Sequence, residues 1–576
     1  MLHLELDSRR SRVEEPPLDL YDKWLGGRGL AGHYLAPAVT ESWDSPRLPL
    51  LLFTGPLVGT PSPTPGRMVF MSRSPLTGTI CDSSVGGSLG FQMKRAGWDG
   101  LVITGRSDRL LGIEIVDDRV ELVDAAPLAG METGPVLERC REKGGCALVG
   151  PAAEQGVAFA NIRVDRGSFA GRGGLGLVMA AKGIKYITVK GSGRVAVADR
   201  EELARAREEI MRLGATSPVL QGELGLVRYG TAAIYDLIDS RRMMPTDNFR
   251  RTHHPRARES NAWAFHRRYD PVSKGCAGCY LRCKKVAADG RHLPEFETLS
   301  HFTAPVGNRD LETVMRANEI CARHGMDTIS AGAVLACRRE VEGRDFRPGE
   351  IEALLEDLGR GRGEGAELAR GAHRYARARG RPEADITVKG QELPAYDPRG
   401  AYGMALGYAL STRGGCHLRS YPIAHEILRK PVVTDRFSFA GKARIIKIAE
   451  DTNAAVDSLT ACKFLFFAAS LEEFARAYTA VTGRESTAQD LLQRGERTCY
   501  HERMMNLRCG FTAADDDLPA RFFTEPGSSG EGIEIPPIDR EDFLRARAAY
   551  YRIRGLDPEG RPDPTRAKEL GIPCND

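Results

Sequence analysis

The sequence predicts an α+β protein in which a β-rich N-terminal part is followed by two mainly α-helical parts. Residues 1 to about 197 are rich in glycine and carry short apolar runs separated by turn signals, as is typical of strands. Beyond residue 199, longer segments of strong helix formers show helical periodicity. The chain has 576 residues, enough for three or four domains. We expect domains at residues 1–198, 199–385 and 386–576.

The N-terminal part contains eight candidate strands and two helical patches. We expect helices at residues 18–25 and 86–95. The strands are expected at residues 2–6, 50–53, 68–72, 100–104, 112–116, 147–149, 157–162 and 184–189. Their number predicts a sheet-based unit.

The rest of the chain has helix signals with recognisable ends. Asp199 is a suitable N-cap for a helix at 200–213, and Gly325 is suited to end a helix at 310–324. Another helix is expected at 329–341, before loops at 359–365 and 380–383. Further helices are expected at 440–456, 471–482 and 540–554, and an irregular segment at 511–530.

The composition and charge of the chain argue against some classes of function. The formal net charge is +4, with acidic and basic residues almost balanced, so no charge pattern predicts nucleic-acid binding. No apolar run reaches about 20 residues, which argues against a membrane span. Thirteen cysteines without a secretory signal favour a reducing compartment, and we expect a cytoplasmic protein.

Three cysteines, Cys276, Cys279 and Cys283, lie within eight residues at CxxCxxxC spacing. An odd number of thiols cannot be paired entirely as disulfides, whereas three thiolates and a distant fourth ligand can hold an iron–sulfur cluster. A zinc site is the alternative, although no second ligand pair follows. Basic residues nearby are expected to lower the thiol pKa values; they are Lys274, Arg282, Lys284 and Lys285.

Residues 171–176 match the pattern GxGxxG. The expected preceding strand ends too early for a dinucleotide site, so NAD is the weaker interpretation. Arg172 beside the glycines favours a backbone phosphate site, as does Arg67 with the Ser84–Gly87 region downstream. A structural turn is the alternative for either segment.

Motifs along nearly the whole chain resemble the tungsten-containing aldehyde ferredoxin oxidoreductase family, as a divergent member. They are Trp24-Leu-Gly-Gly-Arg-Gly-Leu30, Ser72-Arg-Ser-Pro-Leu-Thr-Gly78, the residues 171–182, the cysteine run, Pro294-Glu-Phe-Glu-Thr298, Gly325-Met-Asp-Thr-Ile-Ser330, Arg413-Gly-Gly-Cys-His417 and Asp457–Cys462. The resemblance implies an N-terminal pair of sheets that cradles a bis-pterin cofactor, closed over by two helical domains.

The resemblance also implies the cofactors. Tungsten, with molybdenum as the alternative, would be held by the dithiolene sulfurs of two pterins. A [4Fe–4S] cluster would be held by Cys276, Cys279, Cys283 and the distant Cys462. Mg²⁺ would bridge the pterin phosphates.

The same resemblance assigns the pterin contacts. Phosphates would meet Arg67, Ser84, Gly86, Arg172 and Gly173, and the rings would meet Met326, Asp327, Arg419, Asp457 and Ala461. Three departures stand out: Ser84 replaces the usual Asn, Arg419 replaces a lysine, and both DxxGL-like pterin motifs are altered.

Glu297 and His417 match the active-site residues of the family. Burial should raise the Glu297 pKa and suit it to accept a proton from water, while His417 would bind the substrate carbonyl oxygen. Glu295 is the competitor of Glu297.

The implied reaction is oxidation of an aldehyde to a carboxylic acid, or its reverse. Electrons would pass to ferredoxin or an iron–sulfur subunit, and a homodimer is compatible with the resemblance. Substrate-lining loops are expected near residues 420–428 and 309–310. Two alternatives remain: a class II benzoyl-CoA reductase-like catalytic subunit, and an electron-transfer or assembly subunit that has lost tungsten.

Overall fold

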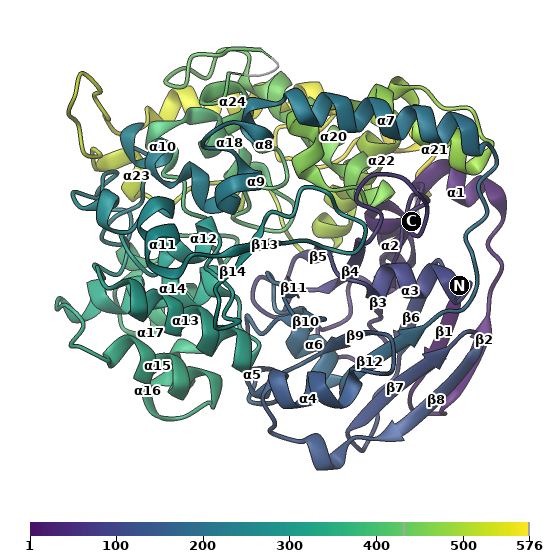
Figure 1. Cartoon of the computed structure of the whole chain (residues 1–576). Coiled ribbons are helices and arrows are strands. Elements are labelled where there is room, and N and C mark those ends of the chain that lie inside the picture. The colour runs from purple at the N-terminus through teal and green to yellow at the C-terminus, as the bar shows by residue number, and fades with distance from the viewer. Residues whose placement is uncertain (430–431, 574–576) are drawn as a thin grey trace.

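The computed structural model describes residues 1–429 and 432–573. The N-terminal part holds two six-stranded sheets, with strand orders β2-β1-β6-β3-β4-β5 and β11-β10-β9-β12-β7-β8. In each sheet one pair is parallel, β1 with β6 and β7 with β12, and the other pairs are antiparallel. Figure 1 shows this part at the lower right, with helices of the rest of the chain above it and to its left.

The first sheet comprises β1 (Leu2–Glu5), β2 (Arg10–Val13), β3 (Leu50–Phe53), β4 (Met68–Arg73), β5 (Ile80–Val85) and β6 (Gly100–Thr104). The second comprises β7 (Leu111–Val116), β8 (Arg119–Asp124), β9 (Gly145–Leu148), β10 (Ile162–Val164), β11 (Ser168–Ala170) and β12 (Ile184–Lys190). Short helices connect them: α1 (Leu18–Trp24), α2 (Gly27–Leu35), α3 (Leu89–Arg95), α4 (Thr133–Cys140), α5 (Pro151–Glu154) and α6 (Leu175–Ala181).

In the two six-stranded sheets most predicted strands are present, but one is misplaced and four strands were not predicted. The strand expected at 157–162 is instead the short β10, because the chain still turns after α5. In these sheets, the strands that the sequence did not predict are β2, β5, β8 and β11. β2 is exposed along its whole length, and β5 buries the polar Asp82 and Ser83, so neither shows an apolar alternation.

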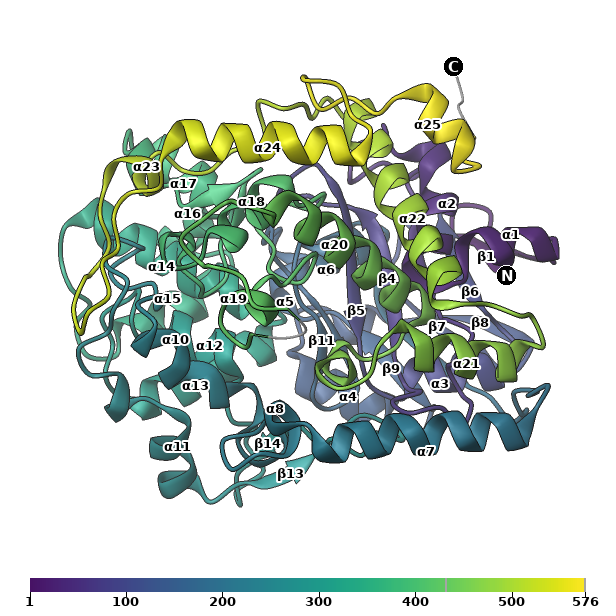
Figure 2. The same ribbon diagram turned by 90° about the horizontal axis from the view of Figure 1, so that it is seen from above.

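The helical parts contain α7 (Arg200–Thr216), α12 (Phe296–His301), α13 (Leu311–His324), α14 (Thr328–Glu342), α15 (Glu350–Gly359), α16 (Gly363–Leu368), α17 (Ala372–Ala378), α18 (Tyr402–Leu410), α19 (Ile423–Glu426), α20 (Lys442–Leu459), α21 (Leu471–Thr482), α22 (Ala488–Arg508), α23 (Arg521–Thr524) and α24 (Arg540–Arg554). Long helices pack in pairs: α20 lies against α22 and α24, and α7 against α21 (Figure 2). The cysteine run lies in the connection between the paired antiparallel strands β13 (Val272–Lys274) and β14 (Lys284–Val286).

Helix ends with clear caps were predicted well. The Asp199 side chain accepts the Glu202 N–H at the start of α7, and Gly325 ends α13 at a φ of 78°. The loop expected at 359–365 is shorter, because α15 runs to Gly359 and α16 begins at Gly363. The long α22 was not predicted, since it buries many polar side chains.

One main apolar core runs from β1 to the C-terminal helices. Glycines bring α2 against the end of α20: a Cβ on Gly27 would lie 2.3 Å from the Asp457 carbonyl oxygen, and one on Gly55 would lie 2.2 Å from that of Leu459. This close approach places the N-terminal part directly beside the residues at the end of α20. Among the described residues, we find no helix with the length and apolarity that crossing a membrane requires.

Candidate cofactor and active site

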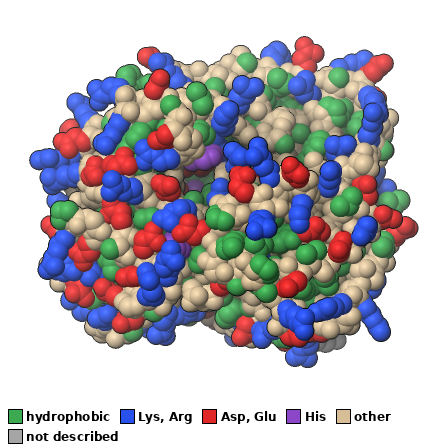
Figure 3. Space-filling model, turned by 60° about the horizontal axis from the view of Figure 1, so that its bottom comes forward, with side chains coloured by type: hydrophobic (Ala, Val, Ile, Leu, Met, Phe, Trp, Pro, Cys, Tyr) green, Lys and Arg blue, Asp and Glu red, His purple; other side chains and the backbone are tan. Residues whose placement is uncertain are grey.

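A cavity of about 1760 Å³ lies between the sheets and the helical parts. Pockets for drug-sized ligands usually span about 300–1,000 Å³, so this one has room for a large cofactor and a substrate. Blue and red side chains are mixed over the face shown in Figure 3, in keeping with the balanced charge.

Most predicted site residues line this cavity. They are Arg67, Ser84, Gly86, Arg172, Cys276, Cys279, Cys283, Glu297, Met326, Asp327, His417, Asp457 and Cys462. Gly173, Arg419 and Ala461 are absent from the lining, and the Ala461 side chain packs in an apolar cluster with Leu459 and Leu465. Of the predicted substrate loops, residues 420–428 contribute to the lining, whereas Asp310 caps α13 instead.

The four predicted cluster cysteines come together from two distant segments. The thiols of Cys276, Cys279 and Cys283 all lie close enough to that of Cys462 to affect one another's ionisation. Gly86 packs against this group, since a Cβ there would lie 2.2 Å from Cys276 Sγ. Within residues 1–429 and 432–573, no three Cys, His, Asp or Glu side chains converge as a single metal ion would need. A multi-atom cluster holds its thiolates farther apart than one zinc ion does.

The expectation that nearby basic residues lower the thiol pKa values was wrong. Burial and the neighbouring thiols raise the pKa of Cys279 to about 11, and the pKa values of Cys283 and Cys462 are also raised. The lysines point elsewhere: Lys284 bonds Ser168 Oγ at 2.8 Å, and Lys285 bonds the Val227 carbonyl oxygen at 2.8 Å.

Arg67 faces these thiols, and Lys463 also carries a charge that acts on Cys462. Burial lowers the pKa of Arg67, but Cys462 and Cys276 raise it more, and the net pKa lies above the usual value. Its guanidinium donates to the Ser84 carbonyl oxygen at 2.9 Å and lies 3.2 Å from Ser84 Oγ. Arg67 therefore connects the predicted phosphate residues to the predicted cluster residues.

The glycine-rich turn at 171–174 follows β11 directly, so the expected gap before the turn was wrong. Dinucleotide binding is still disfavoured, because β11 is separated from β12 by β10 and β9 and no parallel βαβ unit forms. Gly173 adopts a φ of +84°, and Arg172 donates to the carbonyl oxygens of Gly415 at 2.7 Å and Glu392 at 2.6 Å. The turn thus ties the second sheet to the C-terminal part.

Asp327 and Asp457, the two carboxylates predicted to contact the pterin rings, differ in the hydrogen bonds and ion pairs that they already make within the protein. Asp327 caps α14, accepting from Ser330 Oγ at 2.9 Å, and lies 3.4 Å from Arg172. Asp457 pairs through Oδ2 with Lys463 at 2.8 Å and Arg28 at 3.4 Å. Its Oδ1 is buried without a hydrogen-bond partner among the described residues. Asp457 therefore has a free acceptor at the cavity wall.

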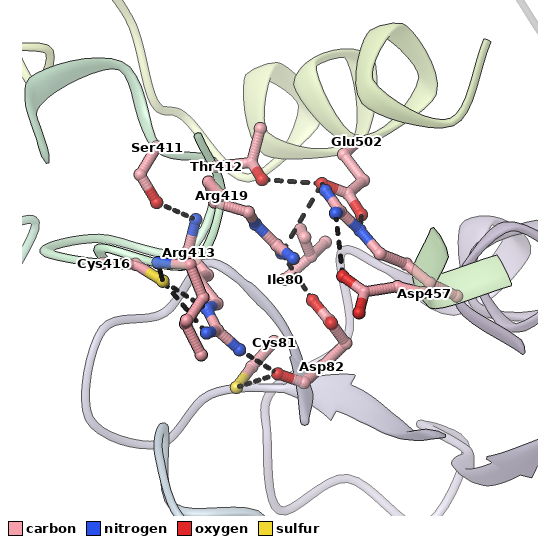
Figure 4. A network of polar contacts seen from close by, with 12 residues as sticks. Ile80, Cys81, Asp82, Ser411, Thr412, Arg413, Cys416, Arg419, Asp457 and Glu502 are labelled. Atoms are coloured by element: carbon pink, nitrogen blue, oxygen red, sulfur yellow. Dashed lines mark hydrogen bonds and ion pairs between the residues drawn. The ribbon is translucent and has the colours of Figure 1, made fainter. Parts of the chain in front are cut away.

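Arg419 belongs to a buried network beneath the cavity (Figure 4). It pairs with Asp82 and lies 3.5 Å from Glu502, which binds Arg28 at 2.6 Å. Burial raises the pKa of Asp82, but Arg419, Arg28 and Arg413 outweigh it and hold that pKa well below its usual range. Arg28 was not predicted from the sequence, although its Gly-Arg-Gly motif was noted.

Glu297 lies on α12, and its carboxylate reaches the cavity. Oε2 accepts the Ala395 N–H at 2.9 Å, while Oε1 is buried with no hydrogen-bond partner in the described chain. Burial raises the pKa of Glu297 to about 8, the direction that the sequence predicted. Glu295 is exposed, and therefore lacks this environment.

His417 faces Glu297, with 3.7 Å between Nε2 and Oε1. Its Nδ1 is buried and has no partner within the described residues. Burial and the nearby Arg172 and Arg413 lower the pKa of His417 well below its usual value, so the ring is neutral at pH 7. A protonated carboxyl and a neutral imidazole thus face the same space.

Two tyrosines lie beside His417. The rings of Tyr396 and Tyr421 lie 5.5 Å and 6.0 Å from that of His417, and both line the cavity. Tyr421 falls within the predicted substrate loop at 420–428, whereas Tyr396 was not predicted.

Fold and site together define a class of redox enzyme that encloses a large cofactor between a two-sheet domain and helical domains. The family model described as "Aldehyde ferredoxin oxidoreductase, N-terminal domain" matches residues 1–191, and that described as "domains 2 & 3" matches residues 205–572. The chain belongs to the aldehyde ferredoxin oxidoreductase family and is an oxidoreductase, as the sequence predicted.

Individual relatives agree with this assignment. The tungsten-containing aldehyde ferredoxin oxidoreductase of Pyrococcus furiosus is 35% identical, over 99% of this chain and 98% of that protein. An aliphatic sulfonate oxidoreductase, WOR-like subunit, of the same organism is 26% identical, over 99% of this chain and 96% of that protein. The active-site complex of benzoyl-coenzyme A reductase with 1,5-dienoyl-CoA has the same fold, with a TM-score of 0.82 at 19% identity, covering 99% of this chain and 96% of that one.

Proposed function

We propose that this protein oxidises aldehydes to carboxylic acids and passes the electrons to ferredoxin or to a partner iron–sulfur subunit. The balanced half-reaction is RCHO + H₂O → RCOO⁻ + 3H⁺ + 2e⁻. The observation that carries the proposal is the facing pair of Glu297 and His417, in one cavity with four cysteines and the predicted phosphate residues.

The residues present fit a tungsten or molybdenum bis-pterin and a [4Fe–4S] cluster; Mg²⁺ would be held mainly by the pterin phosphates, because no three carboxylate, histidine or cysteine side chains converge for it among the described residues. Asp457 offers an unpartnered buried acceptor for ring N–H groups, and the space beside Gly86 brings Cys276 close to Arg67 and Ser84. Ser84, Arg172 and the glycine turn would meet phosphates, and the four cysteines would hold the cluster. When bound, the pterin-held metal supplies two-electron oxidation of the carbonyl carbon, and the cluster supplies one-electron transfer to the acceptor.

Glu297 would act as the base. Its ionised form accepts a proton from the water that attacks the aldehyde carbon, and its pKa near 8 makes proton exchange possible close to neutral pH. The free Oε1 is the atom available for that proton.

His417 would orient the substrate. As a neutral ring it can donate one N–H to the carbonyl oxygen, where negative charge develops as water adds. Tyr396 packs against its ring and limits its rotation.

The test combines metal analysis with kinetics. Protein purified without oxygen should contain about one tungsten or molybdenum and four irons per chain, and should reduce a dye when an aldehyde is added. Glu297→Gln should keep both metals and lower kcat by roughly 10²–10⁴-fold. Iron without tungsten or molybdenum, even after growth with tungstate, would favour the electron-transfer alternative.

The benzoyl-CoA reductase-like alternative rests on fold similarity. It predicts activity with an aromatic acyl-CoA and none with a free aldehyde, so the same preparation distinguishes the two. The Glu297–His417 pair favours aldehyde oxidation because that reaction needs a base for water.

A further inference from the structure

The part of the cavity beside Glu297 and His417 is bounded by aromatic rings. The ring of Tyr421 lies 6.1 Å from Tyr396 and 6.0 Å from Phe467, edge to face in both pairs. Phe464 stacks on Phe467 at 6.3 Å. All four rings line the cavity, and so they form a continuous aromatic wall that starts at the catalytic pair.

Apolar side chains continue from this wall toward the surface. The apolar side chains of Ala424, Leu428, Ile445 and Ala449 line the same cavity. Leu418 and Ile448 also line it and are 36% and 46% exposed, so apolar groups reach solvent there. This passage can admit an apolar substrate from outside.

Tyr421 is held in an unfavourable backbone conformation. Its φ is +46°, a region that bulky residues rarely occupy, and its N–H donates to the His417 carbonyl oxygen at 2.9 Å. Strain of this kind persists only where the surroundings enforce it, and it is common at binding sites. The local turn therefore fixes the ring of Tyr421 beside His417.

The cationic groups whose charge acts on His417 are Arg172, Arg413 and Lys463, and all three are engaged; Arg172 donates to the carbonyl oxygens of Gly415 and Glu392. Lys463 binds Asp457 at 2.8 Å and the Leu418 carbonyl oxygen at 2.9 Å. The Arg413 guanidinium bonds Cys416 Sγ at 2.9 Å. An aldehyde that carries a phosphate or carboxylate would have to displace one of these contacts, which disfavours sugar-phosphate substrates.

We infer that the substrate is an aromatic aldehyde, whose ring packs against Tyr421 and Phe467 while its carbonyl group lies at Glu297 and His417. The inference rests on the proposed aldehyde oxidation and adds the substrate class to it. Offset and edge-to-face ring contacts favour an aromatic group over a short alkyl group of equal polarity. The exposed apolar passage then serves as the route of access.

The kinetic test compares benzaldehyde with acetaldehyde in the holoenzyme. Wild-type kcat/KM should be at least about tenfold higher for benzaldehyde. Phe467→Ala should lower kcat/KM for benzaldehyde by about tenfold or more and that for acetaldehyde by less than about threefold. Tyr421→Phe should keep the preference, because the ring and not the hydroxyl makes the contact. Phe523→Ala is the matched control, since Phe523 is half-buried and packs on Phe543 outside the cavity.

A binding measurement separates this inference from the proposed function. Calorimetric titration of the holoenzyme should show benzoate binding at least about tenfold more tightly than acetate, with the difference lost in Phe467→Ala. Tight benzoate binding without oxidation of any aldehyde would overturn the proposed function and leave the aromatic site standing. Aldehyde oxidation with equal efficiency for both substrates, or an equal loss for both in Phe467→Ala, would overturn the aromatic inference alone.

Discussion

The pKa values of two carboxyl groups in this protein, Glu297 and Asp82, are shifted in opposite directions. Glu297 meets one backbone N–H, and the nearby charge of Arg172 opposes the effect of burial only in part, so burial dominates and raises its pKa to about 8. Asp82 is buried more completely, with 1% of its surface exposed, but Arg419, Arg28 and Arg413 overcome the burial and hold its pKa low. The first arrangement suits proton transfer and the second suits rigidity.

The raised pKa of Glu297 makes stability depend on pH. Between pH 4.5 and about 8 the unfolded chain releases this proton and the folded chain keeps it, so the free energy of unfolding falls as pH rises. Glu297 contributes up to about 1.4 kcal/mol per pH unit in this window. The charged and titratable groups that face Glu297, whether its carboxyl group is protonated or ionised, are Arg172, Asp327, Cys416, His301 and His417.

Glu297→Gln should therefore show a shallower decline of stability from pH 5 to pH 8 than the wild type. Urea denaturation at several pH values measures this directly. Parallel pH profiles for the two proteins would contradict the assignment of the shift to Glu297.

Substitution of Arg419 tests how much a single buried residue contributes to stability. Arg419→Met leaves Asp82 and Glu502 with one cation fewer in a buried network, and should destabilise the protein by about 3–5 kcal/mol. Arg545→Met is the control: Arg545 pairs with Asp542 on the surface, and its loss should leave the denaturation midpoint almost unchanged. Equal effects of the two substitutions would mean that the network is not the cause.

At the scale of elements, the sequence was informative where local signals decide the structure. α21 and α24 begin and end where the sequence predicted, because Ser470 and Asp539 cap their starts and glycines end them. α22 was missed because Glu502 and Asn506 face inward for polar contacts with other elements, and His501 packs against the ring of Trp24. Such contacts bring together residues hundreds of positions apart, and no local pattern records them.

Gly86 links the first sheet to the cysteine connection between β13 and β14. Gly86→Ala would bring Cβ within 2.2 Å of Cys276 Sγ, and should displace that thiol and lower the iron content without unfolding the protein. The control is Gly134→Ala in α4, where a Cβ meets nothing within 4 Å. Iron analysis of both variants is the measurement, and full iron content in Gly86→Ala would argue against Cys276 as a ligand.

For the whole molecule, family membership could be predicted from the sequence, as could a β-rich N-terminal part followed by mainly helical parts. Most of the predicted site residues line the cavity, but Gly173, Arg419 and Ala461 do not. What could not be predicted is how those residues are held. The partners of Arg172, the pairing of Arg419 with Asp82 and the rings around His417 depend on tertiary packing. The thiol pKa values were predicted wrongly for the same reason, because neighbouring lysines in sequence point away in space.

Substitution of Cys462 tests whether the cysteine run and the C-terminal part of the chain are coupled through a shared cluster. If this residue joins the other three cysteines around a cluster, Cys462→Ala should lose iron and also lower Tm, since a ligand bound only to the folded state stabilises it. Residues 272–286 should become more sensitive to protease. Cys509→Ala, which removes a cysteine outside the predicted ligands, should retain iron; a Cys462 variant with full iron and unchanged Tm would refute the coupling.

The assembly of this cavity from every region of the chain has a consequence for how such an enzyme can evolve. Arg67 lies directly before β4 of the first sheet, Cys276 and Glu297 come from the middle part, and Cys462 comes from the C-terminal part, yet all four line one cavity. No segment carries a usable fraction of the chemistry by itself. Exchange of a segment between homologues therefore succeeds only when the incoming piece matches both neighbours. New specificity should arise by point substitutions along the aromatic wall, and hardly ever by shuffling of gene fragments.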